Sequence, residues 1–179
     1  MRVRPESRAV TSVAMRVTVD VEFAERYWYP DDGGQVWLAG YQLVDPDSGA
    51  FLARDAPALA ERGLHIAGVA GAARHHADTL ASDALAPGLP LVLRRDAGNP
   101  HDASAIAVHA AGEGGAQAGW VPRELAAELA SDLDAGRPWS AVVLRELRPS
   151  PRHARSGATM LLAAGDAIEL RVRGDSRAG

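Results

Sequence analysis

Residues 89–128 read LPLVLRRDAGNPHDASAIAVHAAGEGGAQAGWVPRELAAE, and this stretch decides the fold. In residues 89–95 leucine recurs at every second position, a period that predicts a strand with one buried face. Residues 105–109, AIAVH, alternate again and predict a second strand. Between them, residues 99–102, NPHD, favour a tight turn, because proline presets φ and the asparagine side chain bonds the backbone ahead. The pattern therefore predicts a β-hairpin with a polar tip.

A short strand and a helix follow this hairpin. Glycines at 112, 114 and 115 end the second strand, and residues 119–121, GWV, form a short apolar segment. Pro122 suits the first turn of a helix, where its missing N–H would be unpaired in any case. Leucines then recur every four residues, as on a helix that covers a core. We expect a helix over residues 122–135, which Gly136 ends.

The flanking sequence predicts further strands. Residues 15–23, MRVTVDVEF, alternate cleanly, as in a half-buried antiparallel strand. Residues 35–44 predict its partner in a hairpin over 15–44, with a turn at 31–34 and a bulge at Gly40. Residues 50–62 are expected to be a connector with one helical turn. Other strands are predicted at residues 64–69, 139–147 and, as a closing hairpin, 159–163 and 167–172, with a short helix at 77–85.

Together these elements predict a mostly β (α+β) fold. We expect a small OB-like antiparallel β-barrel with two short helices and an N-terminal β-hairpin extension, because closing a sheet removes its exposed edges. The chain is expected to divide into a disordered segment (1–14), the hairpin extension with its connector (15–60), the main domain (61–148) and a basic loop with the closing hairpin and a frayed tail (149–179). Translation starts at either Met1 or Met15.

The composition limits the classes of function. The 179 residues carry a formal net charge of −4, and all 19 basic residues are arginines. Proteins that coat nucleic acid carry a basic surface, so broad electrostatic DNA binding is not expected. A pocket that reads one end of a strand is compatible, because it needs few phosphate contacts. The chain has no cysteine and no apolar run of membrane length. We therefore expect a cytoplasmic protein without membrane contact.

Motifs for catalysis are missing from the sequence. There is no P-loop, no G-x-G-x-x-G after a strand and no Ser-His-Asp arrangement. His75 and His76 are adjacent, so we expect their side chains to diverge and not to share a metal. The sequence therefore predicts no enzyme, cofactor or metal site. A metal-dependent hydrolase built on the histidines is a remote hypothesis.

Two motifs resemble a known family. They are L-R-R-D-x-x-N-P-H-D-x-x-A-I-A-V at 93–108 and G-W-V-P-R-E-L-A-x-x-L-A at 119–130. Together they resemble the HIRAN domain, which occurs at the front of fork-remodelling helicase-like ATPases and as a free-standing bacterial protein. The resemblance starts near residues 63–69, GLHIAGV, and covers roughly 62–147. It implies an OB-like fold and a nucleic-acid-binding module that captures the 3′-hydroxyl end of single-stranded DNA, in DNA repair or replication-fork processing.

The resemblance also implies roles for individual residues. Asp102, in the N-P-x-D turn, would accept a hydrogen bond from the terminal hydroxyl, since a carboxylate accepts from an OH and repels a terminal phosphate. His101 stands where the family often has tyrosine, and would stack on a base or bond a phosphate. The remaining nucleic-acid-binding candidates are Trp120 for stacking and Arg94, Arg95, Arg123, Arg74 and His75 for phosphate contacts.

Other interpretations of these residues stay open. Asp102 can simply cap its own turn, Trp120 can belong to the core, and Arg123 can face solvent. Residues 27–29, YWY, suit either a stacking platform or a plug over one end of the barrel, which we favour. The arginine and two aromatics that the family has after its first strand are not at 69–72, which read VAGA. The alternative function is therefore a non-catalytic protein-interaction or accessory module without nucleic-acid contact.

Overall fold

The computed structural model describes residues 13–29 and 34–174. The segment 1–12, most of the turn at 31–34 and the tail at 175–179 lie outside the described residues, so our predictions there are not addressed. In chain order the elements are β1 (Arg16–Trp28), β2 (Val36–Leu43), α1 (Pro57–Glu61), β3 (Leu64–Gly68), α2 (Ala72–His75), α3 (Ala77–Ala81), a 3₁₀ turn η1 (Asp83–Leu85), β4 (Pro90–Arg95), β5 (Ile106–Ala110), β6 (Gln117–Trp120), α4 (Arg123–Asp134), β7 (Trp139–Arg148), β8 (Gly157–Ala164) and β9 (Ala167–Val172).

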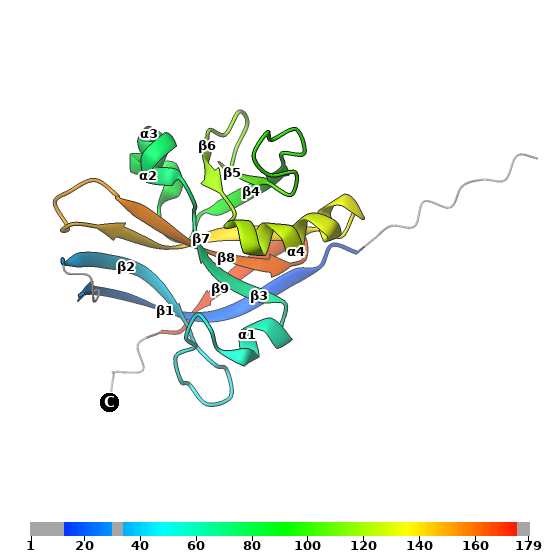
Figure 1. Cartoon of the computed structure of the whole chain (residues 1–179). Helices are drawn as coiled ribbons and strands as arrows, with labels where there is room; N and C mark the ends of the chain where they lie inside the picture. The colour runs from blue at the N-terminus through cyan, green and yellow to red at the C-terminus, as the bar shows by residue number, and fades with distance from the viewer. Residues whose placement is uncertain (1–12, 30–33, 175–179) are drawn as a thin grey trace, which may run out of the picture.

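The nine described strands belong to one sheet (Figure 1). Its main path runs β6-β5-β4-β7-β2-β1-β9, and β8 pairs with both β7 and β3 off this path. Every pair is antiparallel except β1 with β9, which is parallel. The mostly β class is confirmed. Among the described strands the path does not return to its start, so the OB-like barrel that we expected is an open sheet.

The N-terminal hairpin is confirmed, and it is continuous with the sheet. β1 pairs with β2 from Val21–Leu43 to Trp28–Val36, and β2 pairs in turn with β7. The pairing of β1 with β2 has no register shift, so our prediction of a bulge at Gly40 is wrong. Gly40 serves close packing instead, because a Cβ there would overlap the carbonyl oxygen of Leu144.

The closing hairpin that we predicted at the C-terminal end does not form. β8 has β7 on one edge and β3 on the other, so neither edge is free for β9. After the turn at Gly165, β9 instead pairs with β1, in a parallel register that begins at Arg16–Ala167. The Asp166 side chain accepts a hydrogen bond from the Met15 N–H at 2.6 Å, where the two strands meet. Occupied strand edges therefore decide where the last strand pairs.

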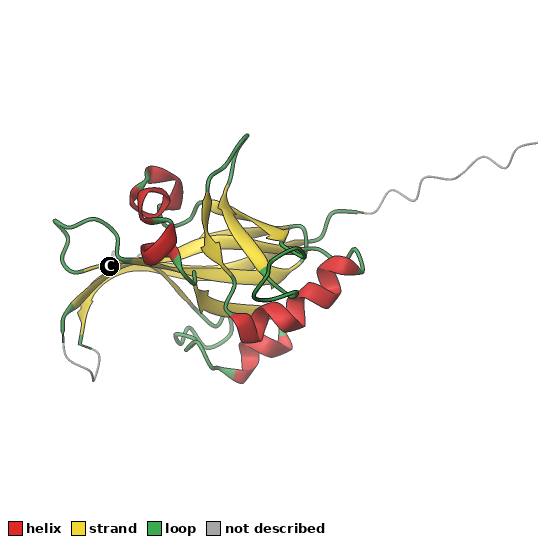
Figure 2. Cartoon of the chain, turned by 45° about the horizontal axis from the view of Figure 1, so that its top comes forward, coloured by secondary structure: helices red, strands yellow, loops and turns green. Residues whose placement is uncertain are grey.

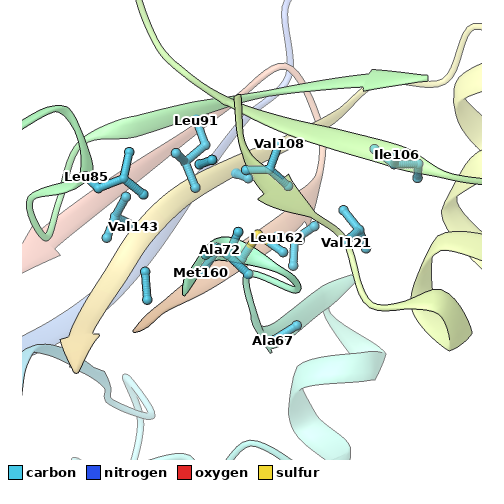
Figure 3. Packing of buried hydrophobic residues seen from close by; sticks show 14 of the residues in the cluster. Ala67, Ala72, Leu85, Leu91, Ile106, Val108, Val121, Val143, Met160 and Leu162 are labelled. Atoms are coloured by element: carbon cyan, nitrogen blue, oxygen red, sulfur yellow. The ribbon is translucent and has the colours of Figure 1, made fainter. Parts of the chain in front are cut away.

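The strands β7 and β8 lie between two hydrophobic cores. In β7, Ala141 and Val143 face the first core cluster, while Val142 and Leu144 face the second. Figure 3 shows the first cluster, in which Met160 and Leu162 of β8 meet side chains from the neighbouring strands. Burial on both faces explains why these two strands read as continuous apolar runs and not as alternating ones.

The helices lie outside the sheet, with α2 and α3 together and apart from α4 (Figure 2). The predicted helix at 122–135 is α4, whose Leu129 is fully buried in the first cluster. The predicted helix at 77–85 is shorter, as α3 followed by η1. We expected two short helices, whereas the described residues contain four, because α1 starts at Pro57 and α2 follows Gly71, whose φ is 70°.

The aromatic run at 27–29 does not plug an end of the sheet. Trp28 is 50% and Tyr29 69% exposed, so the packing role that we favoured is wrong. β9 pairs with β1 only as far as Val21, so in the described structure the outer edge of β1 has no strand beside it beyond that point. Trp28 and Tyr29 therefore lie at the part of the hairpin where β1 has no neighbouring strand on its outer edge.

Candidate functional site

The turn between β4 and β5 is held by its own asparagine, as predicted. Asn99 Oδ1 accepts hydrogen bonds from the backbone N–H of His101 at 2.9 Å and of Asp102 at 3.3 Å. The Asn99 amide also donates to Asp96 Oδ2 at 3.0 Å. Bonds of this kind stabilise a turn from within its own sequence. They orient the two side chains at the tip, His101 and Asp102.

The two oxygens of Asp102 have different surroundings. Oδ1 accepts a hydrogen bond from the Ser104 N–H at 2.9 Å, so this oxygen caps the turn. Oδ2 lies 3.5 Å from Nε of Arg123, at the start of α4, and the Asp102 side chain is 23% exposed. Arg123 is 71% exposed and donates from Nη2 to the His101 carbonyl oxygen at 2.7 Å. One carboxylate oxygen is therefore structural, while the other faces a cation at the surface.

The ring of Trp120 forms a wall beside this turn. The backbone of Trp120 exchanges hydrogen bonds with Ala70, and a Cβ on Gly119 would overlap the Ala70 carbonyl oxygen. The Trp120 ring centroid lies 6.0 Å from that of His75 and 5.2 Å from that of His76. We expected the adjacent histidines to diverge. The helical conformation is interrupted at His76 (φ −136°), between α2 and α3, and both imidazole rings contact Trp120.

Two polar atoms in this aromatic group have no partner. Trp120 Nε1 and His76 Nε2 are buried and make no hydrogen bond in the described structure. Burial lowers the pKa of His76, and the nearby His75 and His109 lower it further. The His76 imidazole is therefore neutral at pH 7. Burying a polar group without a partner has a cost, and of these two residues Trp120 lines the pocket described next.

The turn at 99–102 shares one pocket with Trp120, His75 and Arg123, and this pocket has a volume of about 330 Å³. It is lined by Ala70, His75, Asn99, His101, Asp102, Ala105, Trp120, Val121 and Arg123. Five of the residues that we selected from the sequence therefore meet here. Sequence reasoning gave Asn99 only a structural role and did not select Ala70, Ala105 or Val121, whose small or apolar side chains carried no chemical signal.

The other three selected residues do not line this pocket. Arg94 is exposed on β4, and Arg74 is exposed on α2. Arg95 is bound within the protein: Nε donates to Asp134 Oδ1 at 2.8 Å, and the guanidinium also donates to two backbone carbonyls, Ala105 at 2.7 Å and Ala103 at 3.0 Å. Arg95 lowers the pKa of Asp134 by hydrogen bonding. It therefore ties the turn to α4 and is not part of the pocket lining.

Within residues 13–29 and 34–174, no group of three or more His, Asp or Glu side chains is arranged to hold a metal ion. In the same part of the chain, no helix has the length and apolarity needed to cross a membrane.

The family model for the HIRAN domain matches residues 64–145, which include the whole pocket. Residues 64–145 form a HIRAN domain. HIRAN domains are nucleic-acid-binding modules, which agrees with a pocket that combines a carboxylate, an arginine and aromatic rings. No curated protein matches the chain.

Two solved structures are similar to the chain. The HIRAN domain of human HLTF has 23% sequence identity and a TM-score of 0.39, over 56% of this chain and 76% of that one. A protein from Lactobacillus plantarum has 21% identity and a TM-score of 0.35, over 56% of this chain and 99% of that one.

Proposed function

We propose that this HIRAN domain binds the 3′-hydroxyl end of single-stranded DNA in the pocket at residues 99–102, as a non-catalytic module in DNA repair or replication-fork processing. The observation that carries the proposal is the position of Asp102. Its carboxylate lies in the wall of a pocket that also holds aromatic rings and an exposed arginine. The volume is at the lower end of the range for ligand pockets, which suits one terminal nucleoside and not a duplex.

Asp102 is suited to read a hydroxyl end. Among the described residues its Oδ2 accepts no hydrogen bond and has only the ion-pair contact with Arg123 Nε at 3.5 Å, so it has lone pairs for a terminal O–H. An O–H···O⁻ bond is short and strong, whereas a 3′-phosphate in the same place would meet a negative charge. The carboxylate therefore supports a preference for hydroxyl over phosphate at the end of the strand.

The neighbouring residues supply the remaining contacts of a bound end. Arg123 is exposed beside Asp102 and would bond the phosphate that precedes the terminal nucleoside. Trp120 and His75 line the same pocket and present ring surfaces for the base, since aromatic–base stacking tolerates any sequence. His101, exposed at the tip of the turn, provides a further ring.

The test compares two fluorescent 12-nucleotide strands that differ only at the 3′ end, hydroxyl or phosphate, by anisotropy at two salt concentrations. We expect the wild-type chain to bind the hydroxyl strand more tightly, and Asp102→Asn to remove this preference. Asp47→Asn is the matched control, because it makes the same chemical change at an exposed residue in the turn after β2, outside the pocket.

Equal affinities for the two ends in the wild type, or a preference that survives in Asp102→Asn, would contradict end recognition. Equal binding with a steep salt dependence would indicate only a weak non-specific surface.

A protein-interaction module is the second candidate function. It is favoured by the exposed aromatic side chains on β1, which are Phe23, Tyr27 and Trp28. If the chain binds neither DNA strand, the protein-interaction function is supported. Sedimentation of the chain alone then tests whether the partner is a second copy of the same chain. Loss of self-association in Phe23→Ser would support it.

A further inference from the structure

A second and larger groove lies outside the HIRAN pocket, where the N-terminal hairpin meets β7. Its volume is about 670 Å³. Three arginines reach it from separate segments: Arg26 on β1, Arg54 on the loop before α1, and Arg145 on β7. The rest of the lining is Trp28, Leu38, Gln42, Phe51, Leu52, Ala53, Leu147 and Thr159. None of the three arginines was selected from the sequence.

These arginines lack negatively charged partners. Among residues 13–29 and 34–174, no carboxylate lies within 4.0 Å of the guanidinium of Arg26, Arg54 or Arg145. Arg145 has one long contact, from Nη1 to the Tyr41 carbonyl oxygen at 3.5 Å. Its pKa is lowered by burial and then by the charges of Arg54 and Arg26. In the part of the chain that the structure describes, the three like charges therefore converge without a counter-ion.

Arg26 and Arg54 are exposed, whereas Arg145 is partly buried and in this respect differs from the other partly buried charges nearby. Glu146, the residue after Arg145, points to the opposite face of β7 and is held by Arg148 and Arg155. On β1, the buried Asp20 accepts a hydrogen bond at Oδ1 from Arg171 Nε, 2.6 Å away. Since partly buried charges are normally paired in folded proteins, we expect Arg145, with the exposed Arg26 and Arg54 beside it, to bind a partner from outside.

The chemistry of the groove identifies the partner as an oxyanion attached to a planar ring. Guanidinium groups bind phosphate through paired N–H donors, and a converging set offers several such pairs. Trp28 and Phe51 are exposed at the same groove, so each offers a ring face for stacking. A nucleotide in a nucleic-acid strand has both parts.

The sheet connects this groove to the HIRAN pocket. Arg145 of β7 pairs with Thr159 of β8, which pairs with Gly68 of β3. Two residues after Gly68 lies Ala70, in the wall of the pocket that contains Asp102. With about 4.8 Å between strands and, at right angles to this, about 3.3 Å per residue along a strand, the backbone at Thr159 is roughly 8 Å from that at Ala70. A few nucleotides cover such a distance.

We propose that the Arg26–Arg54–Arg145 groove binds an internal phosphate of the nucleic-acid strand whose 3′ end occupies the HIRAN pocket, with a base stacked on Trp28. This inference rests on the proposed function and adds a second contact to it. The groove then supplies affinity without reading the end, while Asp102 supplies end selectivity.

The experiment uses the full chain and the same two 12-nucleotide strands. Arg54→Gln is the main variant, because Arg54 is exposed in a loop and its loss leaves the core intact. We expect it to weaken binding of both strands by about three- to tenfold, the scale of one charge-assisted phosphate contact, and to reduce the salt slope by about 0.7. The hydroxyl-over-phosphate ratio should not change. Trp28→Ala should weaken the binding of both DNA strands without changing the salt slope.

Arg16→Gln is the matched control, since it removes the same charge at the other end of β1, where Arg16 forms an exposed ion pair with Glu169. If Arg54→Gln binds like this control while the wild type still prefers hydroxyl ends, the groove proposal fails and end recognition stands. If Asp102→Asn keeps the end preference, end recognition fails instead. Binding of a polyglutamate peptide in place of either strand, lost in Arg54→Gln, would assign the groove to an acidic protein and overturn the proposal.

Discussion

Arg95 ties the turn that carries Asp102 to helix α4, and replacing it with methionine tests how this turn is held. Methionine keeps an unbranched apolar stem but removes the guanidinium. The change removes hydrogen bonds to two backbone carbonyls, Ala103 and Ala105, and a two-point contact with Asp134.

The size of the effect follows from what each partner keeps. The Ala105 carbonyl still accepts from the Asp96 N–H at 2.9 Å, and Ala103 is exposed, so water can replace the lost donor there. Asp134 is more than half exposed, so its ion pair is largely screened. Neither carbonyl is left unsatisfied, so each lost bond to the backbone has its net value of about 0.5–1.5 kcal/mol. Two such bonds exceed the screened ion pair, and we expect Arg95→Met to reduce the free energy of unfolding by about 1–3 kcal/mol.

The assay is urea denaturation of a double-mutant cycle with Arg95→Met, Asp134→Ala and the pair. We expect Asp134→Ala to cost less than Arg95→Met, and the coupling energy between the two sites to be smaller than the whole loss from Arg95→Met. The hydroxyl preference in DNA binding should fall in Arg95→Met, because the turn that carries Asp102 is less firmly held. A coupling energy equal to the entire loss would refute this reasoning, because it would assign the effect to the ion pair and none to the carbonyls.

Three further predictions concern the rest of the fold. Hydrogen bonding to Arg171 lowers the pKa of Asp20 below its usual 3.8, so the ionised carboxylate stabilises the fold above pH 3.8, and this stabilisation is lost as the pH falls through the lowered pKa. The Tm difference between wild type and Asp20→Asn should therefore shrink from pH 7 to pH 3. A difference that stays constant over this range would contradict the prediction. Gly119→Ala should lower Tm and weaken strand binding together, because the added Cβ overlaps the Ala70 carbonyl oxygen at a φ of 154°; unchanged binding would separate that contact from the pocket. Leu129→Ala should cost about 2–5 kcal/mol in chemical denaturation, since Leu129 is fully buried in the first core cluster, and a loss under about 1 kcal/mol would show that the cluster collapses around the gap.

Local pattern was enough for the hairpin that carries the site. The period of two on both sides of residues 99–102 correctly predicted β4 and β5, with Ile106 and Val108 buried on one face. The Asn-Pro sequence correctly predicted a turn held by the Asn99 side chain. These features depend on neighbours in sequence, which is why the sequence alone predicts them.

Contacts between distant segments were not predictable in this way. Nothing in residues 167–172 indicates that β9 pairs with β1 in a parallel register, because that choice depends on β8 having both edges occupied. Arg95 and Asp134 are 39 positions apart, so an arginine selected for DNA contact has an internal partner. The kink at His76 that brings two imidazoles to Trp120 likewise follows from packing and not from local pattern.

The pairing of β3 has a practical consequence for dissecting this protein. β3 lies inside the segment that matches the family, but its partner β8, at Gly157–Ala164, lies outside it. A fragment cut at residues 64 and 145 would leave β3 without its neighbour and would expose Leu64 and Ile66, which the second core cluster now covers. A fragment that keeps the pocket in its native surroundings therefore requires the flanking strands as well, from β1 through β9.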